Sequence, residues 1–163
     1  MNGQAQCAGL VIRPLQPDDG ERLGRLFGRL SPETVYRRFF TRFPGLPAAI
    51  LRYFATGDHD DHQRLAAVCG DEIVAVASWD KAAHGGDAAE IAILVEDAWQ
   101  HCGVGRGLMR TLTAGAADHG ITTLTATVLT ENGPARRLAK SLARPQLVEL
   151  DGPETHFTYR VAS

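Results

Sequence analysis

The sequence predicts a single α/β domain with a mixed central sheet of about seven strands that is flanked by helices. A nearly unbroken apolar run at residues 89–95 is typical of a strand that is buried on both faces. Apolar residues spaced by four follow at 104–116, and a second strand-like segment follows at 122–129, so these segments form one βαβ unit. The 163 residues, of which 44% are hydrophobic, are enough for one domain with a real core.

The first third of the chain has the pattern of a tail, a strand and two helices. Residues 1–8 are expected to form a flexible tail, and residues 9–15 a first strand. Asp18 or Asp19 then caps a helix whose apolar positions follow helical spacing. Ser31 is followed by a proline, which predicts the N-cap and the first turn of a second helix.

A third helix, a hairpin and a loop lead up to the βαβ unit. The helix is expected at 46–55, and the hairpin strands at 65–69 and 73–79 flank a Gly-Asp-Glu turn. The loop at 80–87 holds two adjacent glycines and is expected to be mobile. After the unit we expect a helix and a terminal hairpin, at 134–143, 146–150 and 155–161.

The composition is that of an ordinary globular protein, with 22% charged residues. A formal net charge of −2 argues against a general nucleic-acid binder. No apolar run approaches the length of a membrane span and the N-terminus lacks a signal-peptide pattern, so we expect no membrane partner. Cys7, Cys69 and Cys102 are odd in number and widely spaced, which predicts reduced thiols and a cytoplasmic location.

A glycine loop, Gln100-His101-Cys102-Gly103-Val104-Gly105, joins the apolar strand to the amphipathic helix. Two glycines at such a turn let the backbone approach a ligand, and the free amides and dipole of the helix attract anions. A Walker loop is excluded because Arg106 follows where Lys-Ser/Thr is needed, and a dinucleotide fingerprint fits only loosely, with Glu131 as its acid. The loop therefore predicts a pyrophosphate site; the alternative is a turn that only permits close helix–strand packing.

The order of elements and the pattern Gln-x-x-Gly-x-Gly resemble the GNAT superfamily of acyl-CoA-dependent N-acyltransferases. The resemblance spans residues 9–163 as one acetyltransferase domain. It implies acetyl-CoA as cosubstrate and a sheet splayed between its fourth and fifth strands, with the pantetheine arm paired to the fourth strand. The residues that it assigns to coenzyme A are Leu94 and Val95 for pantetheine, Gln100, Gly103, Val104, Gly105 and Arg106 for the pyrophosphate, and Asn132 for the arm near the thioester.

Two segments, 30–40 and 89–95, resemble the Pat-type protein lysine acetyltransferases more narrowly. Enzymes of that type acetylate a lysine of AMP-forming acyl-CoA synthetases, so the resemblance implies a protein partner of this class. The chain departs from the family in its last helix. That helix lacks the usual glycine–phenylalanine ending, and Leu138 or Ala139 stands where many members carry a tyrosine acid.

Direct transfer from a thioester to an amine needs a group that accepts a proton from the amine. Glu90 is the lone charge near the start of the apolar strand, where burial is expected to make the carboxylate a stronger base. It also matches the catalytic glutamate of Pat-type enzymes. The backbone N–H of Val95 is expected to polarise the thioester carbonyl. The alternative for Glu90 is an edge residue that only solvates the start of the strand.

Two other enzyme and binding functions stay open beside lysine acetylation. One is an acetyltransferase for a small amine such as a polyamine, amino sugar or antibiotic, which the carboxylates of Asp58, Asp60 and Asp61 support. The other is a non-catalytic acyl-CoA sensor, against which Glu90 and Asn132 count. The run 58–62 also has metal-ligand residue types, but their clustering in one loop gives no coordination geometry, so we expect no metal.

Overall fold

The computed structural model describes residues 9–41, 43, 47–55 and 60–161. The expected tail at 1–8 therefore lies outside the described residues, as do Asp58 and His59. None of the helices in the described ranges combines the length and the apolar character that crossing a membrane requires.

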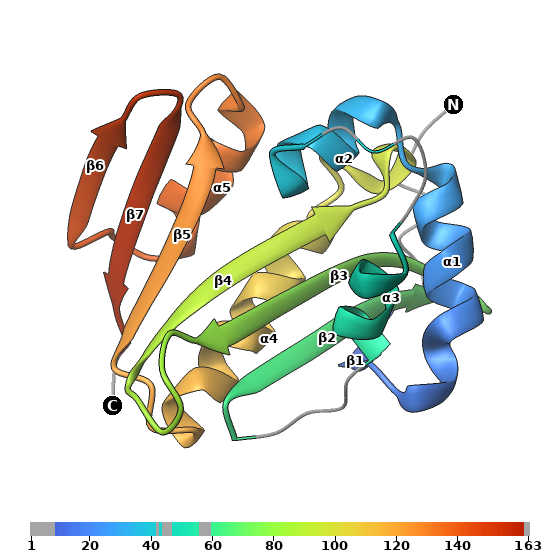
Figure 1. Cartoon of the computed structure of the whole chain (residues 1–163), viewed down its shortest axis with the longest axis horizontal. Coiled ribbons are helices and arrows are strands. Elements are labelled where there is room, and N and C mark those ends of the chain that lie inside the picture. Colours follow the sequence, from blue (N-terminus) through green and yellow to red (C-terminus); the bar gives the residue numbers. More distant parts are fainter. Residues whose placement is uncertain (1–8, 42, 44–46, 56–59, 162–163) are drawn as a thin grey trace.

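The described chain contains a seven-stranded sheet in the order β1-β2-β3-β4-β5-β7-β6 (Figure 1). Neighbouring strands are antiparallel except β4 and β5, which are parallel and joined through a helix. This confirms the predicted α/β fold with a mixed sheet. The strands are β1 (Val11–Pro14), β2 (His62–Cys69), β3 (Glu72–Lys81), β4 (Ala88–Val95), β5 (Thr123–Leu129), β6 (Leu147–Asp151) and β7 (Glu154–Arg160).

Helices cover both faces of the sheet (Figure 1). α4 lies behind β2, β3 and β4 in this view, whereas α1 and α3 lie on the opposite face and α2 sits near the end of β4. Ser31 caps α2 as expected, because its side chain accepts a hydrogen bond from the backbone N–H of Thr34. The helices are α1 (Gly20–Arg29), α2 (Pro32–Phe39), α3 (Ala48–Ala55), α4 (Val104–Asp118) and α5 (Gly133–Leu142), with short 3-10 turns η2 (Pro17–Asp19) and η3 (Asp97–Trp99).

Alternation along the central strands divides the apolar side chains between two cores. On β3, Trp79 packs in the core under α4, which also contains Leu108 and Leu112 of that helix. Val76 points the other way, into the core that Leu26 and Phe54 form beneath α1 and α3. The two cores hold the sheet rigid between helical layers, so the positions of side chains near β4 are well defined.

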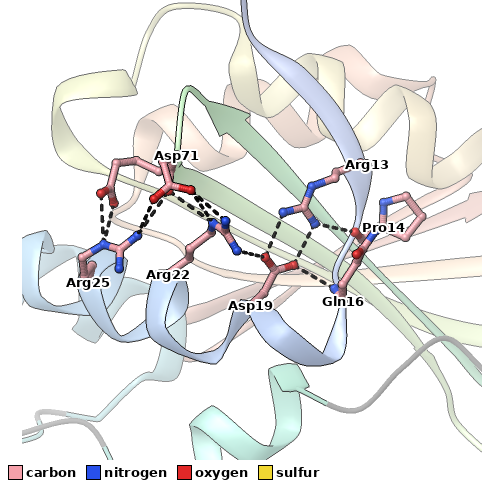
Figure 2. A network of polar contacts seen from close by, with 8 residues as sticks. Arg13, Pro14, Gln16, Asp19, Arg22, Arg25 and Asp71 are labelled. Carbon is pink, nitrogen blue, oxygen red and sulfur yellow. Dashed lines mark hydrogen bonds and ion pairs between the residues drawn. The ribbon is translucent and has the colours of Figure 1, made fainter.

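A buried carboxylate fixes α1 to the first strand (Figure 2). Asp19 is completely buried and accepts two hydrogen bonds from the Arg13 guanidinium, at 2.7 and 2.8 Å. The backbone N–H of Gln16 donates a third, at 2.8 Å. Arg22 extends the network to Asp71 in the β2–β3 turn, at 2.7 Å. These pairs bind β1, α1 and the hairpin turn into one unit.

The structure corrects the expected loop at 80–87 in its first two residues. Asp80 and Lys81 continue β3, because they pair with Glu90 and Ala89 of β4. Asp80 is thus held beside β4, and this places one more carboxylate on the sheet than the sequence indicated.

Candidate active site

The parallel strands β4 and β5 separate partway along their length. Their pairing begins at Ala88↔Thr123 and ends at Ile91↔Ala126, after which the two strands diverge toward the top of Figure 1. A cavity of about 820 Å³ lies there, lined by α2, β4, β5, α5 and the first turn of α4. The expected splay between the fourth and fifth strands is confirmed.

The edge of β4 that borders this cavity carries backbone groups that β5 does not reach. The N–H of Glu96 donates to the C=O of Val74 on β3, at 2.9 Å. In an antiparallel ladder this makes the even-numbered peptides of β4 bond to β3, so those of Ile93 and Val95 point to the opposite side. Leu94, by contrast, turns its peptide toward β3 and buries its side chain beneath α1. Sequence reasoning named Leu94 and missed Ile93, because the hydrogen-bonding parity of a ladder cannot be read from composition.

The loop that enters α4 has the backbone of an anion site. Gly103 is the N-cap residue with φ +83°, and His101 before it has φ +62°, a left-handed conformation that non-glycine residues rarely adopt. The first-turn N–H groups of a helix have no partners within the helix, and they follow directly. Both residues border the cavity. The loop predicted to bind phosphate is therefore a turn that borders the cavity and leads directly into the first turn of α4.

Gly105 stands where the helix comes closest to β4 and α5. A Cβ atom at this position would lie 3.3 Å from Cδ1 of Ile93 and 3.3 Å from Cδ2 of Leu138. Val104 sends its side chain into the core, whereas Arg106 is exposed and lines the cavity. The glycine thus permits the close packing of α4 against β4 and α5.

Polar contacts tie α2 to the glycine loop. The side-chain amide of Gln100 donates to the Val95 C=O at 3.0 Å and to Thr34 Oγ1 at 3.3 Å. Asp97 accepts from the Oγ of Ser31 at 2.7 Å and from Thr34 Oγ1 at 3.1 Å. Burial acts to raise the pKa of Asp97, but these hydrogen bonds outweigh it and lower the pKa below its ordinary value. Gln100 therefore positions the loop through protein contacts while it also borders the cavity.

The wall opposite α2 comes from the start of α5. Asn132 is the N-cap of that helix, and its Oδ1 accepts a hydrogen bond from the N–H of Ala135 at 3.3 Å. Its side chain is largely buried and borders the cavity. Arg137, one turn into α5, lines the same cavity together with Arg106. Two helices thus bring positive charge to this end of the cavity, which favours an anionic ligand.

Glu90 borders the other end of the cavity, on the face of the sheet that α2 and α3 approach. Glu90 is exposed, so the expectation that the surrounding strand buries it is wrong. The apolar run suggested burial on both faces. On this side the helices bury Leu94 toward the end of β4, and they leave Glu90 near its start exposed and bordering the cavity.

A polar cluster lies beside Glu90. The buried Arg64 of β2 donates to Asp80 at 3.0 Å, and its guanidinium lies 4.1 Å from the centre of the Tyr53 ring. The Tyr53 hydroxyl also donates to Asp80. Burial, and then the bond to Asp80, raise the pKa of Tyr53 above its ordinary value. The charge of Asp80 is therefore compensated from two neighbouring elements.

Arg38 of α2 extends this cluster into the cavity, which it helps to line. The guanidinium carbon lies 4.8 Å from the centre of the Phe39 ring. Desolvation lowers the pKa of Arg38, while Tyr53 and Glu90 oppose that shift electrostatically. A cation on α2 thus faces the carboxylates of β3 and β4.

Eight of the nine site residues predicted from the sequence border one cavity, and Val104, whose side chain lies in the core, is the other. Sequence reasoning missed Ile93 and the Asp80 cluster, and it favoured a solvated helix face for Arg38, which lines the cavity. Among the residues that the structure describes, no group of three or more His, Cys, Asp or Glu side chains is placed to hold a metal ion.

Comparisons with known proteins match this architecture. The family model described as Acetyltransferase (GNAT) family matches residues 31–143. Acetyltransferase Pat of Mycolicibacterium smegmatis is 34% identical over 134 residues, which are 80% of this chain and 40% of that protein. The chain thus spans less than half the length of this curated relative.

Solved structures of related proteins superpose on this chain. The GNAT domain of S. lividans PAT superposes with a TM-score of 0.85 at 31% identity, covering 91% of this chain and 89% of that one. A cAMP-binding acyltransferase from Mycobacterium smegmatis superposes with a TM-score of 0.65 at 25% identity, covering 94% of this chain and 44% of that one.

Proposed function

Because this chain belongs to the GNAT family of acetyltransferases, we propose that it transfers an acetyl group from acetyl-CoA to the lysine amine of a protein acceptor. One observation carries the proposal. The edge of β4 that β5 does not reach, at Ile93 and Val95, runs between the turn before α4 at one end and the Glu90 carboxylate at the other. A long thioester with a phosphate at its far end fits that arrangement.

Coenzyme A fits the cavity residue by residue. Its pyrophosphate would take the first-turn amides of α4 after Gly103, with Arg106 and Arg137 supplying positive charge. Its pantetheine amides would pair with the outward-facing N–H and C=O of Ile93, as an added strand does at a sheet edge. Leu94 and Asn132 also line the cavity, and Asn132 would face the arm near the thioester. The absent side chain of Gly105 lets α4 pack closely against Ile93 beside this edge.

Glu90 is the proposed base. A lysine ammonium has a pKa of about 10.4, so only a small fraction is neutral at pH 7 and a carboxylate must accept its proton. The amine nitrogen then forms a bond to the acetyl carbon, and the bond from that carbon to sulfur breaks. The N–H of Val95 would donate to the carbonyl oxygen as negative charge develops on it. Glu90 can meet an incoming side chain directly because it is exposed at the cavity mouth.

The acceptor proposed is a protein lysine, with AMP-forming acyl-CoA synthetases as the candidate class. The support is the similarity to acetyltransferase Pat and the resemblance of residues 30–40 and 89–95 to that type. A cytoplasmic location belongs to the same proposal, and the odd, scattered cysteines of the sequence support it.

A small cationic amine is the second candidate acceptor. Asp80 and Glu90 stand side by side at the acceptor end, and paired carboxylates attract a small polyvalent cation. Arg64 and Arg38 oppose this attraction, because each brings a positive charge to the same cluster. The protein acceptor is therefore the better supported of the two.

The experiment that tests the proposal follows the acetyl group. The purified chain is incubated with labelled acetyl-CoA and a lysate of its own organism, with a Glu90→Gln variant as control. Label on protein lysines that depends on Glu90 is the expected result. Label in small amines instead supports the second candidate. Binding of acetyl-CoA with no transfer to either fraction contradicts both and supports a sensor.

A further inference from the structure

A hydroxyl in the cavity wall is joined to an imidazole outside it. Thr127 of β5 lines the cavity, and its Oγ1 lies 2.9 Å from Nδ1 of His156 on β7. The two residues are direct partners in the β5–β7 ladder, so their side chains share one face of the sheet. A titratable group that the proposed chemistry has not used thus reaches the cavity through a hydroxyl.

Carboxylates surround the other nitrogen of this imidazole. His156 Nε2 lies 3.5 Å from Glu154, the first residue of β7, and 3.8 Å from Asp151, the last residue of β6. Glu149 stands directly opposite His156 on β6, and the nearby residues of β5 on this face, Thr125, Thr127 and Leu129, carry no charge. The imidazole side chain is 33% exposed, so it exchanges protons with water. His156 therefore lies between an anionic surface and a hydroxyl of the cavity.

Thr127 also occupies a special place in the sheet. The last rung between β4 and β5 is Ile91↔Ala126, so Thr127 is the first residue of β5 beyond the point where the strands part. Glu90 pairs with Thr125, and side chains two residues apart on a strand share a face, so Thr127 lies on the face of Glu90. In α5, Leu138 and Ala139 border the same cavity and carry no hydroxyl, and Ser141, which also borders it, donates its hydroxyl to the Leu138 C=O at 2.9 Å.

We propose that Thr127 is a catalytic residue that donates its hydroxyl proton to the sulfur of the leaving coenzyme A, and that His156 is a positioning residue that restores this proton. The inference rests on the proposed function. As the bond between acetyl carbon and sulfur breaks, the sulfur takes the hydroxyl proton. Thr127 Oγ1 takes the proton of His156 Nδ1, and the imidazole recovers a proton from solvent beside Glu154 and Asp151.

Kinetics of four variants test the catalytic part. Thr127→Val removes the hydroxyl at nearly constant shape and should lower kcat by about 10²-fold, with the KM for acetyl-CoA nearly unchanged. Thr127→Ser should restore most of the rate, and His156→Gln should lower kcat without raising that KM. Thr125→Val is the matched control, because it loses a hydroxyl on the same face and should keep the wild-type rate. A Thr127→Val variant with kcat within twofold of wild type overturns the inference.

Binding supplies a readout that does not depend on turnover. At pH 9 a thiol with a pKa of about 8.5 is mostly ionised, so a donor at position 127 should favour coenzyme A over its desulfo analogue. Calorimetry should show that Thr127→Val loses this preference, by about tenfold, while its affinity for desulfo-CoA stays the same. Equal preference in both proteins contradicts the inference. If the wild-type protein transfers no acetyl group at all, the proposed function itself is refuted. That outcome differs from a failure of the inference about Thr127, in which the wild type is active and Thr127→Val keeps its rate.

Discussion

Glu90 of β4 and Asp80 of β3 are direct partners in the antiparallel ladder, so two carboxylates stand side by side on one face of the sheet. Like charges in this position repel each other unless a neighbour compensates them. Asp80 is compensated by Arg64 and by the Tyr53 hydroxyl, whereas Glu90 faces the cavity. The pair therefore divides into a structural carboxylate and an available one.

Asp80→Asn should separate these two roles. The change removes the charge of the carboxylate that the buried Arg64 guanidinium binds at 3.0 Å, so the free energy of unfolding should fall by about 1–3 kcal/mol. Turnover should stay within about tenfold of wild type, since Asp80 is not the proposed base. Urea denaturation and steady-state kinetics measure the two effects. A loss of turnover as large as that of a Glu90 variant would show that both carboxylates act on the amine.

Gly105→Ala should weaken the binding of coenzyme A. The new Cβ would press against Ile93 and Leu138 at 3.3 Å. The space beside the β4 edge, where the pantetheine arm is proposed to bind, would become narrower. We expect the affinity for coenzyme A, measured by calorimetry, to fall by about tenfold or more. Gly24→Ala is the matched control, because it is also a helical glycine but has nothing within 4 Å of its Cβ position. That variant should bind normally and be slightly more stable; unchanged affinity in Gly105→Ala would argue against this path for the ligand.

The buried Asp19 predicts an acid-dependent stability. The hydrogen bonds from Arg13 lower the pKa of Asp19 against the opposing effect of burial. A carboxyl whose pKa is lowered in the folded state stabilises the fold at every pH above its pKa in the unfolded state, about 3.9. This contribution is lost as the pH falls through the pKa of the folded state. Asp19→Asn should therefore destabilise the protein at pH 7 by about 2–3 kcal/mol.

The measurement compares urea midpoints of wild type and Asp19→Asn from pH 7 to pH 2.5. The gap between them should be constant above pH 5 and should shrink below pH 4, as Asp19 of the wild type takes up a proton. Other carboxylates with a lowered pKa, such as Asp71 and Glu72, titrate in both proteins and cancel in the difference. A gap that stays the same down to pH 2.5 would contradict the stabilising pair with Arg13.

Local patterns predicted the frame of the site. The apolar run at 89–95, the two glycines and the helical stripe are short-range signals, and β4, its loop and α4 follow them closely. Ser31 as a helix cap was likewise predictable, because capping needs only the hydroxyl and the next turn of backbone.

The features of the site that the sequence did not predict depend on strand pairing between segments far apart in the chain. Asp80 lies beside Glu90, and Thr127 beside His156, only because of the strand registers, which no single segment encodes. The choice of Ile93 over Leu94 as a free peptide likewise depends on which rungs of the β3–β4 ladder carry hydrogen bonds. The exposure of Glu90 depends on where α2 and α3 pack, which the apolar run does not reveal.

The central claim is that Glu90 accepts the proton of an amine while the β4 edge holds acetyl-CoA. The most direct test is the turnover of Glu90→Gln at saturating acetyl-CoA, together with its affinity for coenzyme A by calorimetry. We predict that turnover falls by about 10²–10⁴-fold while the affinity stays within twofold, because the side chain lies at the acceptor end of the cavity. Near-normal turnover in this variant, with coenzyme A bound as tightly as before, would contradict the account.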